Sequence, residues 1–185
     1  MMDLGAAARA AHLPLARKVP DMTELPLAIA AETPHDDAAI DRLHERTFGP
    51  GRFARTAFRI REQAGHLRAL SFTARVGTML VGSVRLTPVK IGATPALLLG
   101  PLSVEPPFQS VGIGARLMEV ALEAAQAQGH KLVVLVGDEP YYARFGFKRA
   151  PYGRVTLPGP VDPARLLVAE LQDGAFEGVA GMVGA

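Results

Sequence analysis

The sequence predicts an α/β fold in which helices flank a mixed β-sheet, and three stretches carry that prediction. Residues 70–86 alternate apolar and polar side chains and turn at Gly77-Thr78, as a pair of antiparallel strands does. Residues 113–124 repeat apolar side chains at the spacing of one helix face. Residues 132–136 form an unbroken apolar run, mostly valine, that is typical of a buried parallel strand. A helix that connects two parallel strands is the usual crossover unit, so the last two stretches belong together.

Composition favours a single globular domain. The chain has 185 residues, of which 49% are hydrophobic and 21% charged, and no apolar run approaches the roughly 20 residues that cross a bilayer. Basic residues interrupt the N-terminal stretch, so we expect no signal peptide. The absence of cysteine removes disulfides, a thiolate nucleophile and a cysteine-based metal site, and it fits a cytoplasmic location. A net charge of +2 is too small to call for a nucleic-acid partner.

The distribution of prolines and glycines sets the expected boundaries. Residues 1–25 are rich in alanine, are punctuated by prolines and hold no period, which predicts a flexible tail. The folded domain is expected over residues 26–172. The glycine- and alanine-rich residues 173–185 are expected to form a short C-terminal tail.

Two helices are expected before the first antiparallel strands. Asp36 or Asp37 can cap a helix that ends at Gly49, and a second helix is expected from about Phe53 to Ala64. Further along, residues 96–104 form a third, nearly all-apolar strand, and an apolar strand at residues 166–171 follows a proline-rich loop.

A group of arginines marks the second helix. Spacings of three and four put Arg52, Arg55 and Arg59 on one side of this helix, with Arg61 on another side. Such a group is either a solvated helix face or an attractor for an acidic or phosphorylated acceptor, and the sequence leaves both open.

The stretch Gln109-Ser-Val-Gly-Ile-Gly114 lies between the third strand and the helix at 113–124. Glycines at a helix N-terminus leave the free backbone N–H groups open to an anion such as a phosphate. A Walker A loop would need Lys and then Ser or Thr after the last glycine, where this chain has Ala115-Arg116. A dinucleotide fingerprint would need a third glycine at Leu117. The loop therefore predicts an anion cradle of another kind.

Two motifs together resemble the GNAT N-acetyltransferase superfamily. The first is the coenzyme A pyrophosphate loop, carried here by Leu102-Ser-Val104, Pro106 and residues 109–114. The second is Tyr141-Tyr-Ala-Arg-Phe-Gly-Phe147, which looks like the last motif of that superfamily. The resemblance covers about residues 26–172 and is strongest to the bacterial YhbS-like branch. Ser110 and Val111 depart from the glycine and arginine that are common in the loop, which removes a side-chain partner for the phosphates but keeps the backbone donors.

The resemblance implies a GNAT-type acyl-CoA N-acyltransferase fold, with a mostly antiparallel central sheet that is splayed near residues 102–104 and flanked by helices. Acetyl-CoA would lie in the opening as the acyl donor, its pantetheine arm paired with strand backbone and its pyrophosphate on the glycine loop. The residues expected to bind it are Leu102, Ser103, Val104, Gln109, Ser110, Val111, Gly112, Ile113, Gly114, Ala115 and Tyr142.

The implied chemistry is direct attack of a primary amine on the thioester. The backbone N–H of Leu102 or Ser103 would stabilise the developing oxyanion, an effect worth about 10²–10³ in rate. Tyr142 matches the position of the acid that protonates the leaving thiolate, at little cost if its pKa is near 10. Glu105, just past the splayed strand, is the carboxylate best placed to act as the base, although a solvated residue is the alternative.

Other readings of the same residues remain open. Tyr141 and Tyr142 can both be core residues of a short helix that Asp138 caps, and Asp138 can instead lie at a ligand site. The histidines show no metal-ligand spacing, so we expect no metal. The chain can also be a catalytically silent acyl-CoA-binding sensor or scaffold, or an RNA-associated factor that acts through its arginines. The expected partner is an amine acceptor, either an anionic small molecule or a protein; homodimerisation is left open.

Overall fold

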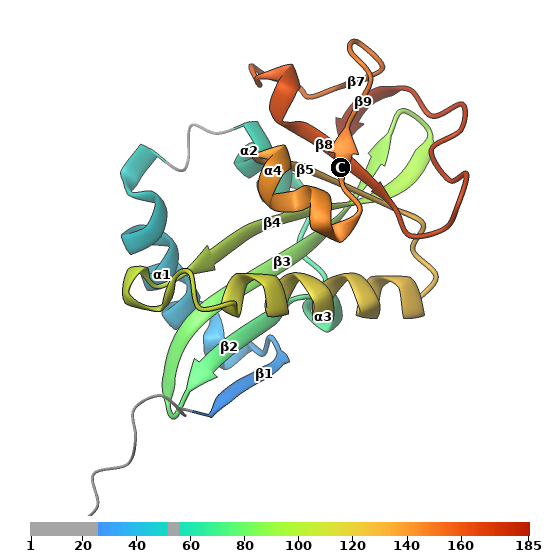
Figure 1. Cartoon of the computed structure of the whole chain (residues 1–185). Helices are drawn as coiled ribbons and strands as arrows, with labels where there is room; N and C mark the ends of the chain where they lie inside the picture. Colours follow the sequence, from blue (N-terminus) through green and yellow to red (C-terminus); the bar gives the residue numbers. More distant parts are fainter. Residues whose placement is uncertain (1–25, 52–55) are drawn as a thin grey trace, which may run out of the picture.

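The computed structural model describes residues 26–51 and 56–185, and Figure 1 shows the arrangement of their elements. Within this part of the chain, the strands form one twisted sheet in the order β1-β2-β3-β4-β5-β8-β6, with β9 paired to β3 and β7 to β9. The strands are β1 (Leu27–Ala31), β2 (Phe72–Val76), β3 (Met79–Ile91), β4 (Thr94–Val104), β5 (Leu132–Val136), β6 (Lys148–Arg149), β7 (Val155–Thr156), β8 (Leu166–Glu170) and β9 (Gly181–Gly184).

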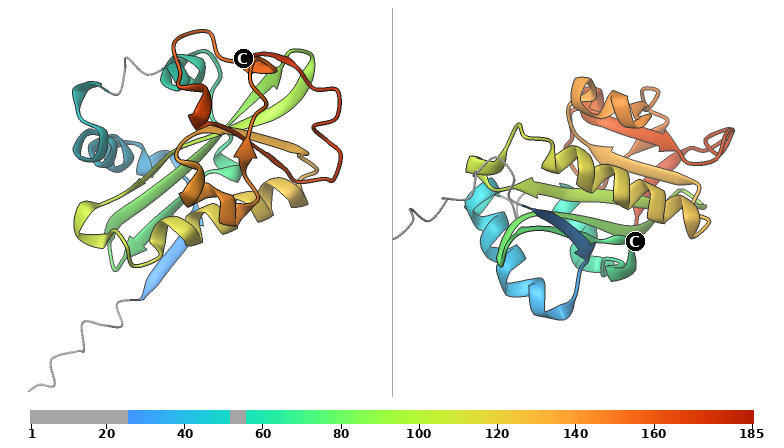
Figure 2. Two further views of the ribbon diagram at one scale, coloured as in Figure 1. Left: turned by 45° about the horizontal axis from the view of Figure 1, so that its top comes forward. Right: turned by 60° about the horizontal axis from the view of Figure 1, so that its bottom comes forward.

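Helices cover both faces of the sheet, and α1 and α3 lie on opposite faces in the right-hand view of Figure 2. The α-helices are α1 (Asp37–Phe48), α2 (Thr56–Gln63), α3 (Ile113–Ala127) and α4 (Glu139–Tyr142). Short 3-10 turns connect them: η2 (Pro34–Asp36), η4 (Arg68–Leu70), η5 (Pro106–Phe108), η6 (Ala143–Phe145) and η7 (Pro163–Arg165). None of the helices in residues 26–51 and 56–185 has the length and apolarity needed to span a bilayer.

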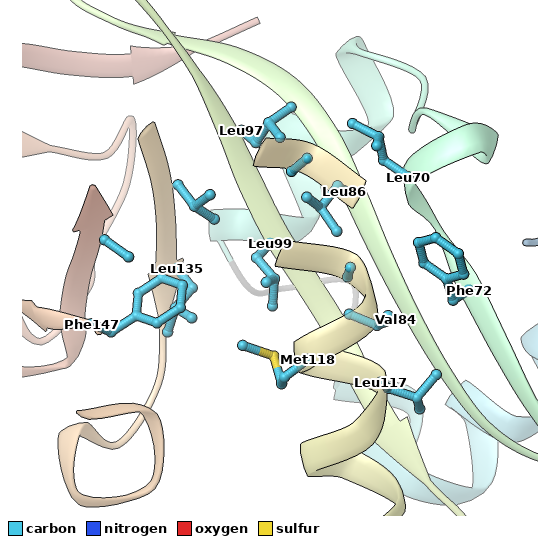
Figure 3. Packing of buried hydrophobic residues seen from close by; sticks show 14 of the residues in the cluster. Leu70, Phe72, Val84, Leu86, Leu97, Leu99, Leu117, Met118, Leu135 and Phe147 are labelled. Carbon is cyan, nitrogen blue, oxygen red and sulfur yellow. The ribbon is translucent and has the colours of Figure 1, made fainter. Parts of the chain in front are cut away.

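The largest core lies between α3 and the sheet. Leu117 and Met118 of α3 are fully buried, and they pack into a cluster with Leu99 of β4 and Leu135 of β5 (Figure 3). The apolar stripe read from the sequence therefore faces the sheet, as the helical period predicted. Because α3 packs in one cluster with side chains of both β4 and β5, it ties together two strands that are hydrogen-bonded over only a short length.

The sheet opens between β4 and β5. These two strands run parallel, as predicted, but they pair only at Leu97 with Val133 and at Leu98 with Val134. On its other edge β4 stays paired with β3 as far as Val104. The residues of β4 from Leu99 onward therefore present one backbone edge without a strand partner. The predicted splay is confirmed, and it begins about three residues earlier than expected.

One boundary differs from the sequence prediction. Residues 173–185 were expected to form a tail, but β9 pairs with β3 at Lys90 and Ile91 and runs parallel to β7, which makes it part of the sheet. Strand β9 has glycines at both ends, so its side-chain pattern gave no signal, and backbone pairing alone identifies it. The predicted tail at residues 1–25, together with Arg52 and Arg55, lies outside the described residues.

Candidate functional site

The loop before α3 has the backbone of an anion cradle. Gly112 is the N-cap residue with φ of 90°, in the left-handed region that favours glycine, and no side chain caps the helix. The first intrahelical bond runs from the N–H of Arg116 to the carbonyl of Gly112 at 3.0 Å. The N–H groups of Ile113, Gly114 and Ala115 therefore have no acceptor within the helix and point outward at the positive end of the helix dipole. The side chain of Ile113 itself is buried in the core.

The residues before Gly112 shape the cradle without adding charge. Ser110 has φ of 64°, so it adopts the left-handed conformation at the position where the resemblance expects glycine. Val111 is 69% exposed and offers no polar atom beyond its backbone. The amide of Gln109 donates to the carbonyl of Val104 at 3.0 Å, which ties the loop to the end of β4. Gln109 therefore holds the loop in place and does not present its amide to a ligand.

Strand alternation decides which amides of β4 face the opening. The N–H of Glu105 donates to the carbonyl of Val81 on β3 at 2.8 Å. Because successive N–H groups along a strand point to opposite edges, Ser103 faces β3, while Leu102 and Val104 face the open edge. The bond from Gln109 to the carbonyl of Val104 agrees with this, since that carbonyl also lies on the open edge. Of the two oxyanion donors expected from the sequence, Leu102 is therefore the one directed into the opening.

Tyr142 lies across the opening from β4, on the side of β5. Its ring packs against Gly137, where a Cβ would come within 2.3 Å of the Tyr142 ring. It also makes an edge contact with the ring of Phe147, with centroids 6.0 Å apart. Burial, with smaller contributions from the nearby Tyr141 and Asp138, raises the pKa of the Tyr142 phenol to about 12. The phenol therefore stays protonated at physiological pH and acts as a hydrogen-bond donor.

Tyr141 does more than pack in the core. Its hydroxyl lies 2.8 Å from where a Cβ of Gly114 would be, beside Val104 and Leu102. The hydroxyl thus reaches across the opening to the first turn of α3, and the ring meets Tyr142 edge-on at 4.8 Å between centroids. Of the two tyrosines, Tyr142 lies on the wall of a cavity, and the Tyr141 hydroxyl faces the first turn of α3.

Glu105 is held in an ion pair rather than exposed to the opening. Its carboxylate is buried and accepts hydrogen bonds from the guanidinium of Arg46 on α1, with Arg46 Nε 2.9 Å from Glu105 Oε1. This hydrogen bond raises the pKa of the Arg46 guanidinium above its usual value. The ion pair therefore engages the Glu105 carboxylate with α1. The geometry favours a positioning role for Glu105 over the role of base expected from the sequence.

A cavity of about 480 Å³ opens beside Leu102 and Tyr142. Its wall includes residues from α1, α2 and η7 that the motifs did not identify, above all His44, Arg61 and Arg165. Arg165 pairs with Asp138 at 3.0 Å, at the rim, where both side chains are about half exposed or more. The cavity thus combines an apolar floor with both signs of charge.

The two described arginines of the α2 group point to different places, as their spacing predicted. Arg59 lines a smaller cavity of about 390 Å³ with Gln63 and Met182. Arg61 lines the main cavity and packs against Gly100, where a Cβ would lie 2.8 Å from its guanidinium. The arginine that reaches the main cavity is therefore the one outside the predicted stripe. Nothing in the local sequence distinguished it.

No group of three or more metal-ligating side chains occurs in the described parts of the chain, residues 26–51 and 56–185. The polar groups described at the opening are backbone N–H groups and tyrosine hydroxyls. They suit an anionic, amide-bearing ligand better than a metal ion.

Comparisons with known proteins agree with this geometry. The family model described as an acetyltransferase (GNAT) domain matches residues 68–149. The protein named uncharacterized N-acetyltransferase YhbS from Escherichia coli strain K12 is 29% identical over 159 residues, which cover 85% of this chain and 95% of that protein. The crystal structure of YhbS from Escherichia coli in complex with CoA has a TM-score of 0.75 and covers 87% of this chain and 90% of that one. A GNAT family acetyltransferase from Brucella melitensis in complex with acetyl-CoA is 30% identical, with a TM-score of 0.58, and covers 83% of this chain and 99% of that one.

Proposed function

Because the chain belongs to the GNAT acetyltransferase family, we propose that it transfers the acetyl group of acetyl-CoA to a primary amine that enters the 480 Å³ cavity. The observation that carries the proposal is the open edge of β4, which leads directly into the uncapped N-terminus of α3. Two similar structures contain CoA or acetyl-CoA, which supports the same ligand here.

The residues at the opening fit acetyl-CoA. The free amides of the first turn of α3 and the left-handed Gly112 suit a pyrophosphate, which needs backbone donors without a Cβ in the way. The N–H of Val104 lies on the open edge of β4, where an amide-bearing arm can pair as an added strand does. The carbonyl of Val104 already accepts from Gln109, so this residue offers the arm a donor rather than both groups.

Leu102 and Tyr142 supply the two electrostatic contributions that acyl transfer needs. The N–H of Leu102 donates to the thioester oxygen as negative charge develops there, and it is fixed in place by the paired edge of β4. Tyr142 donates a hydrogen bond to the departing sulfur. The sequence-based expectation was that proton transfer from Tyr142 to the thiolate costs little free energy. The pKa of about 12 revises it, because a thiol such as cysteine has a pKa near 8.5. Full transfer from Tyr142 is uphill, so the phenol stabilises the thiolate and leaves the final protonation to solvent.

The cavity favours an enzyme over the alternative of a silent sensor. A sensor needs only the cradle and the open edge. Here a further space of about 480 Å³ adjoins Leu102 and Tyr142 and has polar side chains on its walls. That is the place an acceptor must occupy to reach the thioester.

The test has two measurements. Calorimetry should detect acetyl-CoA binding, and a panel of primary amines should be screened for release of free thiol. Tyr142→Phe should bind acetyl-CoA like the parent and lose turnover. Binding with no thiol release from any amine class, including peptides with free N-termini, would overturn the enzyme and leave the sensor. Absence of acetyl-CoA binding would overturn both.

A further inference from the structure

We propose that strand β1 is an interaction surface where a second copy of this chain pairs edge to edge, so that two sheets join across a two-fold axis. This assembly goes beyond the proposed function, and neither depends on the other. Strand β1 ends the sheet, and among the described residues β2 is its one strand partner. Figure 1 shows β1 at the outer end of the sheet. Such an edge presents backbone N–H and C=O groups that another strand can bind.

The sequence of β1 lacks the features with which proteins protect an edge strand, namely shortness, charge, proline or a bulge. Strand β1 reads Leu-Ala-Ile-Ala-Ala, has four exposed residues among its five, and pairs with β2 in a continuous register. The other terminal strands of the described sheet, β6 and β7, have two residues each, and β6 consists of Lys148 and Arg149. The molecule therefore protects these ends of its sheet and leaves the β1 edge open to a partner.

The hydrogen-bond pattern shows which backbone groups of β1 face outward. The N–H of Glu32 donates to the carbonyl of Ser71 at 2.7 Å, in the same register as the pairs between β1 and β2. Successive residues of an antiparallel strand direct their N–H and C=O groups to opposite edges. Every second residue before Glu32 therefore faces β2, and the residues between them, Leu27, Ile29 and Ala31, face outward. These three residues carry the donors and acceptors that a further strand binds.

The outward groups match those of a second copy in antiparallel orientation. In a pairing centred on Ile29, Leu27 lies opposite Ala31 of the other copy, and Ile29 lies opposite itself, so outward groups meet outward groups in each pair. Because β1 has no charged residue, the two strands approach without like charges opposite each other. Leu27, the larger of the paired side chains, meets an alanine, which leaves room for it. A second copy thus meets both the hydrogen-bonding and the side-chain requirements of this edge.

An exposed apolar row adjoins the open edge. Leu27 lies opposite Val76 of β2, and Val76 lies opposite Met79 of β3. Residues directly opposite one another share one face of a sheet, so these three side chains form a row. Leu27 is 39% exposed and Met79 is 50% exposed. Pairing at β1 removes the Leu27 end of this row from water, which favours association.

The symmetry of the contact limits the assembly to two copies. A two-fold contact uses the same strand of both copies, so no open β1 edge remains once it has formed. Strands β2 and β3 separate β1 from the opening between β4 and β5. The contact therefore lies away from the proposed acetyl-CoA site of each copy, and assembly can be tested independently of activity.

The first test measures the full chain by sedimentation equilibrium and by residue-resolved amide hydrogen exchange over a wide range of protein concentration. The mass should rise from that of one copy toward that of two. The amides of Leu27, Ile29 and Ala31 should gain protection over the same range of concentration. The amides of Ala28 and Ala30 face β2 and should keep the same protection throughout, which makes them the internal control.

The second test removes one outward donor. Ala31→Pro deletes an outward N–H from each copy and leaves the bonds to β2 intact. It should raise the dissociation constant of the dimer by about tenfold to a hundredfold, because two hydrogen bonds are lost. Ala31→Ser keeps the N–H and should dimerise like the parent. Both variants should bind acetyl-CoA as the parent does.

The third test exchanges charges across the contact. Ala28 and Ala30 are exposed, and in the proposed register Ala28 lies opposite Ala30 of the other copy. A chain with Ala28→Lys and Ala30→Lys should be monomeric, because like charges directly opposite each other are destabilising. A chain with Ala28→Glu and Ala30→Glu should be monomeric for the same reason. An equal mixture of the two chains should form a mixed dimer.

Contrary results overturn the proposal in distinct ways. A parent that stays monomeric at every concentration excludes the second copy, and constant protection of the outward amides in that monomer assigns the edge to another segment of the same chain. A dimer that survives both Ala31→Pro and the double lysine substitution uses another surface. Failure of the oppositely charged chains to pair excludes the proposed register. If Ala31→Pro fails to fold by circular dichroism, the mixing experiment decides.

Discussion

The two edges of β4 differ in their backbone pairing. Along the edge that faces β3, backbone pairing continues to Val104 and fixes the strand in place. Along the edge that faces β5, pairing stops at Leu98, and the amides of Leu102 and Val104 are left for another partner. The paired edge therefore holds the strand rigid, and the open edge leaves backbone N–H groups available to a ligand. A donor that is fixed before the reaction needs no reorganisation during it.

The largest expected effect is at Gly112, where the open edge meets α3. A change to Val puts a branched side chain at φ of 90° and in front of the pyrophosphate site, so acetyl-CoA binding should be lost in calorimetry. Gly129, just past the C-terminal end of α3, is the matched control, since it has φ of 82° and equally open surroundings. Gly129→Val should show a similar loss of thermal stability and bind acetyl-CoA normally. Equal loss of binding in both variants would show that strain, and not the cradle, is responsible.

The next effect is at Tyr142. Tyr142→Phe removes the hydrogen bond to the leaving sulfur and should lower kcat by roughly 10²–10⁴ with little change in acetyl-CoA affinity. The pKa of about 12 means that ionisation of this phenol causes no loss of parent activity below about pH 10. We expect the defect of the variant to shrink as pH rises, because a thiolate leaves more easily at high pH. Full activity across the pH range would remove Tyr142 from the mechanism.

A moderate effect is expected at the ion pair that joins α1 to β4. Arg46→Ala leaves the buried Glu105 carboxylate without its guanidinium and should cost about 1–3 kcal/mol in the free energy of unfolding. Glu105→Gln should lower kcat less than Tyr142→Phe does. A larger loss of kcat in Glu105→Gln than in Tyr142→Phe would restore Glu105 as the base.

The smallest effect is at Val111, on the outer side of the cradle. Val111→Arg adds a cation at a site that is exposed beside the N-terminus of α3. It should tighten acetyl-CoA binding by about two- to fivefold at low salt, an advantage that declines as salt screens the exposed charge. If the affinity ratio between Val111→Arg and the parent does not change with salt, the pyrophosphate lies away from this position.

Much of the fold was predictable from the sequence because local patterns encode it. The helical period of α3, the valine run of β5 and the glycines between strand and helix each act within a few residues. The list of residues expected to bind acetyl-CoA remains a prediction. The backbone geometry at Gly112 supports the part of that list that lies in the glycine loop. Strand β9 was missed because its stability comes from pairing with β3 and β7. A glycine-rich segment has no side-chain pattern that predicts such pairing.

The acceptor side was not predictable in the same way. His44 reaches the cavity only because α1 lies beside β4, and the contact that fixes it joins Arg46 to Glu105, 59 residues apart in the chain. Arg61 enters the cavity because α2 turns that side of its surface toward Gly100. No periodicity within one helix encodes its orientation against a distant strand. Motifs therefore predicted the donor side, and only the tertiary arrangement shows the cavity that we propose for the acceptor.

The most direct measurement of the central claim is amide hydrogen exchange along β4, resolved by residue, with and without acetyl-CoA. The amide of Ser103 faces β3 and should be protected in both states. The amides of Leu102 and Val104 face the opening, so they should exchange faster in the free chain and become protected when acetyl-CoA binds. Protection gained at Ser103, or no change at Leu102 and Val104 under saturating acetyl-CoA, would contradict the account.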